Sequence, residues 1–512
     1  MSETAVKTGH PKGLYFLFFT EMWERFSYYG MRAIFILFMT KILLMKDADA
    51  SQIYGSYTGL VYLTPLLGGY LCDKFLGNRR SIVIGGLLMA IGQFFMFLSA
   101  SAGADGGVSL MWMGLTSLIV GNGFFKPNIS TMVGQLYPAN DRRIDSAFTI
   151  FYMGINLGAF FSPLITGSMD FKWGFLSACI GMLIGLFAFI LFQKKYLISE
   201  DGKEIGLPVK KLDLTSILMI LGSIGIVFFM LNFKQMFNSD TEIISYLIYG
   251  SMVLMPILIL SDKSLSKIEM NRIIVIFILA FFVIFFWGAF EQAGASLTLF
   301  ADRQTDRTLF GWEMPASYFQ SVNPLAVIAL APIFTIIWGF LYIRKLEPSS
   351  PKKMAIGLAL VALGYVVIAI AVKGIGVEDK VSMWWLIGLY VIHTMGELCL
   401  SPIGLSMVSK LAPLRLSSLM MGTWFLANAA ANKFAGTLSA LIPPTAGVEA
   451  TTEPLVYPSF LGFQITNLYE FFMLFIIMTG TASVILFVLS SWLQKMQHND
   501  HVEGIDLSIE NR

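Results

Sequence analysis

Fourteen apolar segments, most of them close to 20 residues long, recur along this 512-residue chain. A helix of about 20 apolar residues rises about 30 Å, which is the thickness of the hydrocarbon core of a membrane. Only 13% of the residues are charged, against about 25% in a typical soluble domain. The segments cover residues 14–44, 53–76, 81–98, 108–134, 147–167, 173–192, 214–233, 243–260, 273–300, 318–343, 354–372, 383–411, 418–441 and 468–493. The sequence therefore predicts an all-α integral membrane protein with 14 transmembrane helices.

Lys and Arg are distributed unevenly between the loops, and cytoplasmic loops retain positive charge during insertion. With the amino terminus inside, 23 of the 35 basic residues lie on the cytoplasmic side, 8 lie outside, and the remaining 4 lie within segments. The first segment is too long and too charged for a cleavable signal. We therefore expect a multi-pass protein of the cell (inner) membrane with both termini cytoplasmic.

Charge, cysteine and histidine content exclude several other classes. The net charge is only +2 and no soluble domain carries a basic cluster, so no nucleic-acid partner is expected. Cys72, Cys179 and Cys399 are widely separated, which suggests neither disulfides nor a metal site. A membrane-embedded hydrolase or transferase would need a nucleophile with a base, or a metal set. His393 is the only histidine within a segment and no such motif is found, so we expect no enzyme activity.

The loop "LCDKFLGNRR", residues 71–80, is at least a tight, positively charged cytoplasmic turn. It also resembles the Gly-x-Leu-x-Asp-Lys/Arg-x-Gly-Arg-Arg signature of the major facilitator superfamily, whose fold has two six-helix halves. Fourteen segments would then divide as 6 + 2 inserted + 6. The expected parts are a bundle at 1–195, a linker with two inserted helices at 196–268, a second bundle at 269–495 and a cytoplasmic tail at 496–512. The inserted helices lack an interior ionisable residue, so we expect them to pack against lipid without a transport role.

The first segment carries charges where hydrocarbon should be. Each charge near mid-membrane costs at least about 2.5 to 3.5 kcal/mol. One helix face carries Glu21, Arg25, Tyr28 and Arg32, and it is flanked by Glu24 and Tyr29. The spacing of 4, 3 and 4 keeps the first four within about 40°. This stripe predicts that the first helix faces a polar space between the helices.

Four further charges suggest two ion pairs between the halves. Arg32 and Glu291 each lie 18 residues into symmetry-matched helices, about 27 Å from the cytoplasmic end. Lys126 and Glu397 occupy another matched pair, at or below mid-membrane on the cytoplasmic side. The alternative is a buried pair that only fixes helix register. We expect the outer and the inner pair to form alternately, and we expect their glutamates to bind and release protons. Together these properties predict proton-coupled transport by alternating access.

Two longer motifs resemble the proton-dependent oligopeptide transporter family. "EMWERFSYYG", residues 21–30, fits the Glu-x-x-Glu-Arg-Phe-x-Tyr-Tyr-Gly motif, and "FYMGINLG", residues 151–158, fits Phe-Tyr-x-x-Ile-Asn-x-Gly. The likeness spans the chain, and 14 helices with a central inserted pair are the usual bacterial layout. Animal members carry a histidine on the second helix; this segment has none, with Tyr54 in the general region, and His393 is expected to be structural.

The resemblance implies roles for individual residues. It implies proton coupling for Glu21 and Glu24 with the adjacent Arg25. Glu291 is a further expected proton-coupling residue, because a buried glutamate whose cation comes and goes titrates between states. The resemblance implies that Arg25 and Lys126 bind the peptide carboxylate and that Glu397 binds the amino terminus. Arg32–Glu291 matches the outer gate of the family, and the matched helices assign Lys126–Glu397 as the inner gate. Further expected substrate contacts are Tyr29, Arg32, Tyr62, Asn156, Trp287, Asn323, Ser401 and Trp424, although each aromatic alone could be ordinary packing or an interfacial anchor.

The resemblance thus implies a symporter that imports di- and tripeptides, with peptide-like drugs as candidate cargo. Protons are the expected coupling ion, no other cofactor is expected, and membrane lipids surround the protein. The oligomeric state stays open. The alternative is a major facilitator for another small zwitterionic or anionic solute, such as an amino acid, nitrate or a drug. The cations Arg25 and Lys126 opposite the anion Glu397 favour a zwitterion with separated ends.

Overall fold

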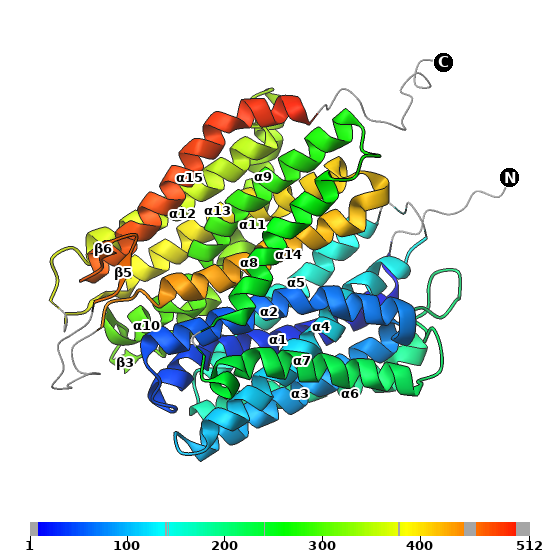
Figure 1. Cartoon of the computed structure of the whole chain (residues 1–512), viewed down its shortest axis with the longest axis horizontal. Coiled ribbons are helices and arrows are strands. Elements are labelled where there is room, and N and C mark those ends of the chain that lie inside the picture. Colours follow the sequence, from blue (N-terminus) through cyan, green and yellow to red (C-terminus); the bar gives the residue numbers. More distant parts are fainter. Residues whose placement is uncertain are drawn as a thin grey trace.

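The computed structural model describes residues 9–138, 141, 143–239, 241–376, 379–444 and 457–497. Long helices lie side by side in one bundle (Figure 1). Eleven helices of the described part are long and apolar enough to cross a membrane, and the three other long helices, α1, α2 and α14, carry more polar side chains. The prediction of an all-α protein with fourteen long helices is confirmed. Residues 498–512 of the predicted tail lie outside the described residues.

The first six helices form the amino-terminal half. Their bounds are α1 Lys12–Lys41, α2 Asp47–Leu71, α3 Asn78–Ala102, α4 Gly107–Gln135, α5 Ile144–Thr166 and α6 Phe171–Tyr196. Between α2 and α3 the loop predicted as a tight turn contains the helical turn η1, Cys72–Leu76, and then Gly77. Gly77 has φ +75°, a conformation that glycine adopts without a steric penalty.

Six long helices in the second half repeat this arrangement. Their bounds are α9 Lys267–Phe290, α11 Val322–Ile343, α12 Ser350–Ala371, α13 Met383–Leu411, α14 Ser417–Ser439 and α15 Leu468–Met496. In the first half α1 packs on α5 and α6, and α3 packs on α4 and α6. In the second half α9 packs on α14 and α15, and α12 packs on α13 and α15. The two halves therefore have equivalent packing, and α1 corresponds to α9.

The halves meet along two seams, one between α2 and α14 and the other between α5 and α11. At the first seam the backbones approach closely, because both helices have glycine at the crossing. A Cβ on Gly436 would lie 2.6 Å from the Cα of Gly55. The glycines thus allow two helices from opposite halves to touch.

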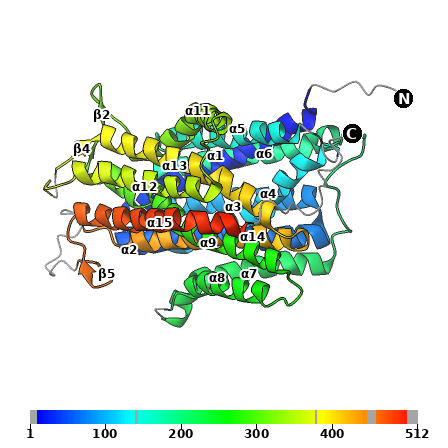
Figure 2. The same cartoon turned by 90° about the horizontal axis from the view of Figure 1, so that it is seen from above.

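The two inserted helices are α7 Leu214–Phe237 and α8 Ile243–Leu260. They lie at the edge of the molecule, below the other helices in Figure 2. Helix α7 packs on α4 of the first half, whereas α8 packs on α14 of the second half and also touches α2. The inserted pair therefore contacts both halves.

The apolar segment predicted at 273–300 is not one continuous helix. Helix α9 ends at Phe290, and the tighter turn η2 and the short helix α10 follow it. The remaining short elements are η2 Glu291–Gly294, α10 Ser296–Arg303, η3 Ala316–Ser321, η4 Leu414–Leu416, β1 Thr305–Asp306, β2 Thr308–Leu309, β3 Trp312–Glu313, β4 Val381–Ser382, β5 Ser459–Phe460 and β6 Phe463–Gln464. Strand β1 pairs in parallel with β4, and the pairs β2–β3 and β5–β6 are antiparallel hairpins.

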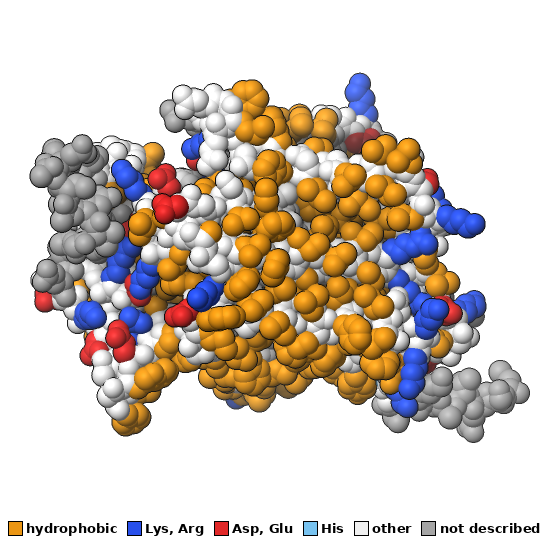
Figure 3. All heavy atoms as spheres, turned by 90° about the horizontal axis from the view of Figure 1, so that it is seen from below, with side chains coloured by type: hydrophobic (Ala, Val, Ile, Leu, Met, Phe, Trp, Pro, Cys, Tyr) orange, Lys and Arg blue, Asp and Glu red, His pale blue; other side chains and the backbone are white. Residues whose placement is uncertain are grey.

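Hydrophobic side chains cover the middle of the surface, and charged side chains gather at its two ends (Figure 3). Such a belt suits a hydrocarbon environment. We call the end where α1 begins and α6 ends the basic end, since Lys194 and Lys195 lie in the last turn of α6. The opposite end, where α1 ends and α2 begins, is the distal end.

Candidate functional site

The stripe on α1 contains a compact buried cluster of Glu21, Glu24 and Arg25, here called the Glu–Arg cluster. Arg25 Nε lies 3.0 Å from Glu21 Oε1 and also donates to Glu24 Oε2. The second oxygen of Glu24 accepts a hydrogen bond of 3.1 Å from Asn122 Nδ2 on α4. All three cluster residues are at most 3% exposed. Two carboxylates thus share one guanidinium away from solvent.

Part of this cluster has unused hydrogen-bonding capacity. Arg25 Nη2 and Glu21 Oε2 are buried and have no hydrogen-bond partner among the described residues. Lys126 on α4 has its ammonium 4.6 Å from the centre of the Tyr62 ring. No ion pair of Lys126 is found in the part of the chain that the structure describes. Lys126 therefore has no anionic partner among the described residues, and Arg25 keeps one free nitrogen beside its two carboxylates.

Nearer the distal end, Arg32 joins the two halves. Arg32 Nη2 donates to Glu291 Oε2, where α9 gives way to η2, and Arg32 Nε donates to the Tyr54 hydroxyl at 2.7 Å. The charged pair is almost fully buried. Gly294 makes room for it, because a Cβ there would overlap the Tyr54 hydroxyl and lie 3.0 Å from Arg32 Nε. Arg32 and Glu291, which the sequence pairs because they lie at equal depth in matched helices, are thus in contact in the structure.

Glu397 on α13 is held by a neighbouring amide instead of a cation. Asn323 Nδ2 donates to Glu397 Oε2 at 2.8 Å and lies 3.0 Å from Thr394 Oγ1. Among the described residues Glu397 makes no ion pair, so the structure does not join Lys126 to Glu397. Of the two expected pairs, the one near the distal end is formed and the other is open.

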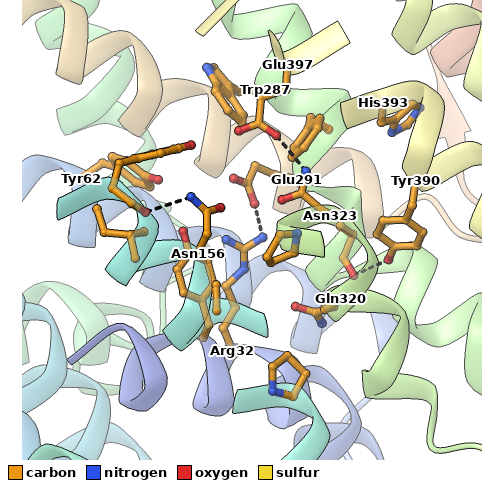
Figure 4. Close-up of a pocket in the computed structure, with 18 residues that line it drawn as sticks. Arg32, Tyr62, Asn156, Trp287, Glu291, Gln320, Asn323, Tyr390, His393 and Glu397 are labelled. Atoms are coloured by element: carbon orange, nitrogen blue, oxygen red, sulfur yellow. Dashed lines mark hydrogen bonds and ion pairs between the residues drawn. The ribbon is translucent and has the colours of Figure 1, made fainter. Parts of the chain in front are cut away.

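Arg32, Glu291, Asn323 and Glu397 line a cavity between the halves with a volume of about 130 Å³. Figure 4 shows Arg32 and Glu291 pointing toward one another, with Asn323 bonded to Glu397 beside them. The expected residues that line the cavity are Tyr29, Arg32, Tyr62, Asn156, Trp287, Glu291, Asn323 and Glu397. They come from α1, α2, α5, α9, η2, α11 and α13, so the site depends on both halves.

The other expected residues are not among those that line this cavity. The Glu–Arg cluster and Lys126 are on the α1 and α4 side. Ser401 follows Glu397 by one turn of α13, and the buried Trp424 ring packs against Gly404. Their expected roles in binding stay predictions.

Sequence reasoning missed several wall residues, among them Tyr152, Gln320 and Tyr390. Tyr390 donates from its hydroxyl to the Ala293 carbonyl at 3.2 Å. Tyr152 precedes Asn156 by one helical turn inside the motif at 151–158, which is a signal that could have found it. His393 also borders the cavity, but its Nε2 lies 3.2 Å from the Val361 carbonyl, in keeping with a structural residue.

Comparison with known proteins gives the family. A family model described as "POT family" matches residues 79–452. This chain belongs to the POT family. The POT fold also matches in three dimensions: the crystal structure of a POT family transporter in complex with 5-aminolevulinic acid has a TM-score of 0.78 and 34% identity, over 96% of this chain and 98% of that one. The predicted major facilitator fold, with two inserted helices between six-helix halves, is confirmed.

Two relatives of this POT family chain are named as peptide transporters. The peptide transporter YePEPT of Yersinia enterocolitica is 38% identical over 84% of this chain and 88% of its own length. Dipeptide and tripeptide permease A of Chromobacterium violaceum is 30% identical over 97% of both chains. The chain is therefore a multi-pass membrane transporter and not an enzyme.

Proposed function

We propose that this chain is a proton-coupled symporter that imports di- and tripeptides by alternating access. The observation that carries the proposal is a pair of opposite charges from the two halves, Lys126 on α4 and Glu397 on α13, neither of which makes an ion pair among the described residues. Arg25 pairs with Glu21 and Glu24 but keeps Nη2 without a partner. A short peptide is a zwitterion whose carboxylate suits a guanidinium or an ammonium and whose amine suits a carboxylate. The names of the two curated relatives support the same cargo.

The open and closed pairs support alternating access. Arg32–Glu291 closes the distal side, while Lys126 and Glu397 stand apart. Opening of the distal side requires the first pair to separate, and pairing of Lys126 with Glu397 would then close the other side. The basic end faces the cytoplasm of the cell (inner) membrane, with both termini inside, as the excess of Lys and Arg predicts.

The Glu–Arg cluster is the proposed proton site. Two carboxylates and one guanidinium carry a net charge of −1, and a buried net charge is costly unless a cation lies near or a proton binds. Lys126 is the nearby cation. When its charge is taken up by Glu397 or by a peptide carboxylate, protonation of Glu21 or Glu24 restores neutrality. Substrate binding and proton binding are therefore linked.

One observation favours a second kind of zwitterionic cargo besides peptides. The POT family structure with 34% identity contains 5-aminolevulinic acid, which has an amine and a carboxylate but no peptide bond between amino acids. Cargo recognised by its two charged ends would include such molecules and peptide-like drugs. Inhibition of labelled dialanine uptake by unlabelled 5-aminolevulinic acid tests whether the transporter accepts such cargo.

Uptake by purified protein in liposomes tests the proposal. An imposed inward proton gradient should drive labelled dialanine above its equilibrium level, and a protonophore should abolish the accumulation. Absence of gradient-dependent uptake for any di- or tripeptide would reject peptide symport.

A further inference from the structure

A second buried charge cluster lies outside the cavity, at the distal end of α14. Lys433 is 1% exposed, and its ammonium lies 3.1 Å from Gln52 Oε1 and 3.0 Å from Ser56 Oγ, both on α2. It also lies 3.0 Å from Glu242 Oε2, the residue that precedes α8. One ammonium thus joins the first half, the second half and the inserted pair.

The surrounding contacts place this cluster on the α2–α14 seam. Ser51 and Ser439 form a hydrogen bond of 2.9 Å across the seam, near the crossing of Gly55 and Gly436. From outside, the fully buried Ile248 of α8 projects toward Gly59. A Cβ on Gly59 would lie 3.1 Å from Ile248 Cδ1, so the α8 side chain sits against the seam.

The inserted pair is also attached to the first half. The α7 side chains Val227 and Leu231 are buried, on a helix that packs on α4. At the tip of the inserted pair, Glu242 accepts a hydrogen bond of 2.7 Å from Ser245 Oγ and lies 3.3 Å from Lys234 Nζ. Helices α7 and α8 therefore span both halves and present an ordered carboxylate to Lys433.

We propose that the α7–α8 hairpin is a clamp on the distal α2–α14 seam, in which Glu242 is a positioning residue that holds Lys433 against α2. The inference rests on the proposed function, because alternating access requires this seam to part when the distal side opens. In the closed state Glu242 neutralises a buried ammonium, whose loss of a partner is costly. In the open state water reaches Lys433, and an exposed pair contributes little. The hairpin therefore favours the closed state and has a role beyond contact with lipid.

Distances between spin labels at the distal end test the clamp. Labels at Ala48, in the first turn of α2, and at Lys380, before α13, are exposed and lie on opposite halves. The buried cysteines Cys72, Cys179 and Cys399 are replaced by alanine beforehand. In Glu242→Gln the population with the longer distance should rise about fivefold or more relative to the parent. Combined Glu242→Lys, Lys433→Glu and Lys234→Gln should restore the parent distribution, since Gln52 and Ser56 can also donate to a carboxylate and the third change removes the cation beside position 242.

Asp213→Asn is the matched control on the same hairpin. It also converts a carboxylate to an amide, keeps a good N-cap for α7, and lies at the basic end away from Lys433. Its distance distribution should equal that of the parent. An unchanged distribution in Glu242→Gln, or an equal change in Asp213→Asn, would overturn the clamp.

If Glu242→Gln fails to fold, Ile248→Ala decides, because it keeps every charge and removes only the contact with the seam. It should also raise the long-distance population, and an unchanged population would overturn the proposal. The measurement uses no cargo and no proton gradient. Failure of the clamp is therefore distinguishable from failure of the transport proposal, which uptake tests separately.

Discussion

At the residue scale, equal helix depth was enough to pair Arg32 with Glu291. The structure joins them because α1 and α9 occupy equivalent places in the two halves. The sequence could not predict that Tyr54 is the second partner of Arg32, or that Gly294 makes room for its hydroxyl. Those contacts depend on where α9 ends, and periodicity alone does not locate that end within a long apolar run.

Removing the charge of Glu397 should weaken peptide binding more than any other single change in the cavity. Glu397→Gln keeps the size of the side chain and the bond to Asn323 but removes the anion for a peptide amine. Loss of a buried charged partner costs about 2 kcal/mol or more, which is roughly a 30-fold loss of affinity. Binding of dialanine, measured by calorimetry, and driven uptake should both fall by at least that factor. Glu470→Gln, an exposed carboxylate at the start of α15, is the control and should leave both unchanged.

Glu21 should matter for coupling more than for cargo binding. In Glu21→Gln the Glu–Arg cluster is already neutral, so proton binding no longer accompanies transport. Accumulation of dialanine against its gradient should be lost, whereas exchange of labelled for unlabelled dialanine, which needs no net proton movement, should persist. Accumulation equal to that of the parent would contradict the proton role of this cluster.

At the element scale, apolar length predicted all fourteen long helices but not all of their ends. Helix α2 begins at Asp47, six residues before the apolar segment, where Asp47 binds Arg303 of α10 by a bond of 2.7 Å. A hydropathy pattern treats such a charged turn as a loop. The short strands were not predicted, because two-residue pairs such as β1–β4 depend on contacts between distant loops.

The clamp of α7 and α8 should be insensitive to mild acid. Burial alone would raise the pKa of Glu242, but Lys433 and the hydrogen bond from Ser245 outweigh it and lower this pKa to about 2. A depressed carboxyl pKa contributes stability that is present above the ordinary value near 4.5 and is lost as the pH falls through about 2. The effect of Glu242→Gln on the label distances should therefore be the same at pH 7.5 and pH 5.5. A difference that vanishes at pH 5.5 would contradict a charged Glu242 in the folded protein.

At the scale of the whole molecule, the cavity lies between two equivalent halves that meet along two seams and at the Arg32–Glu291 pair. Motifs on α1 and α5 located one wall from the sequence. Charges at matched positions in the two halves predicted residues of the opposite wall, which α9, η2 and α13 form. Tyr390 and Gln320 could not be predicted, since they reach the cavity through the relative placement of the halves.

Coupled movement of protons and peptide is the central claim. It is tested most directly by a pH-sensitive dye inside liposomes that contain the protein. Addition of dialanine outside, with no pH gradient imposed beforehand, should acidify the lumen in step with labelled dialanine uptake, and Glu21→Gln should abolish the acidification. Dialanine uptake by the parent without any acidification of the lumen would contradict the account.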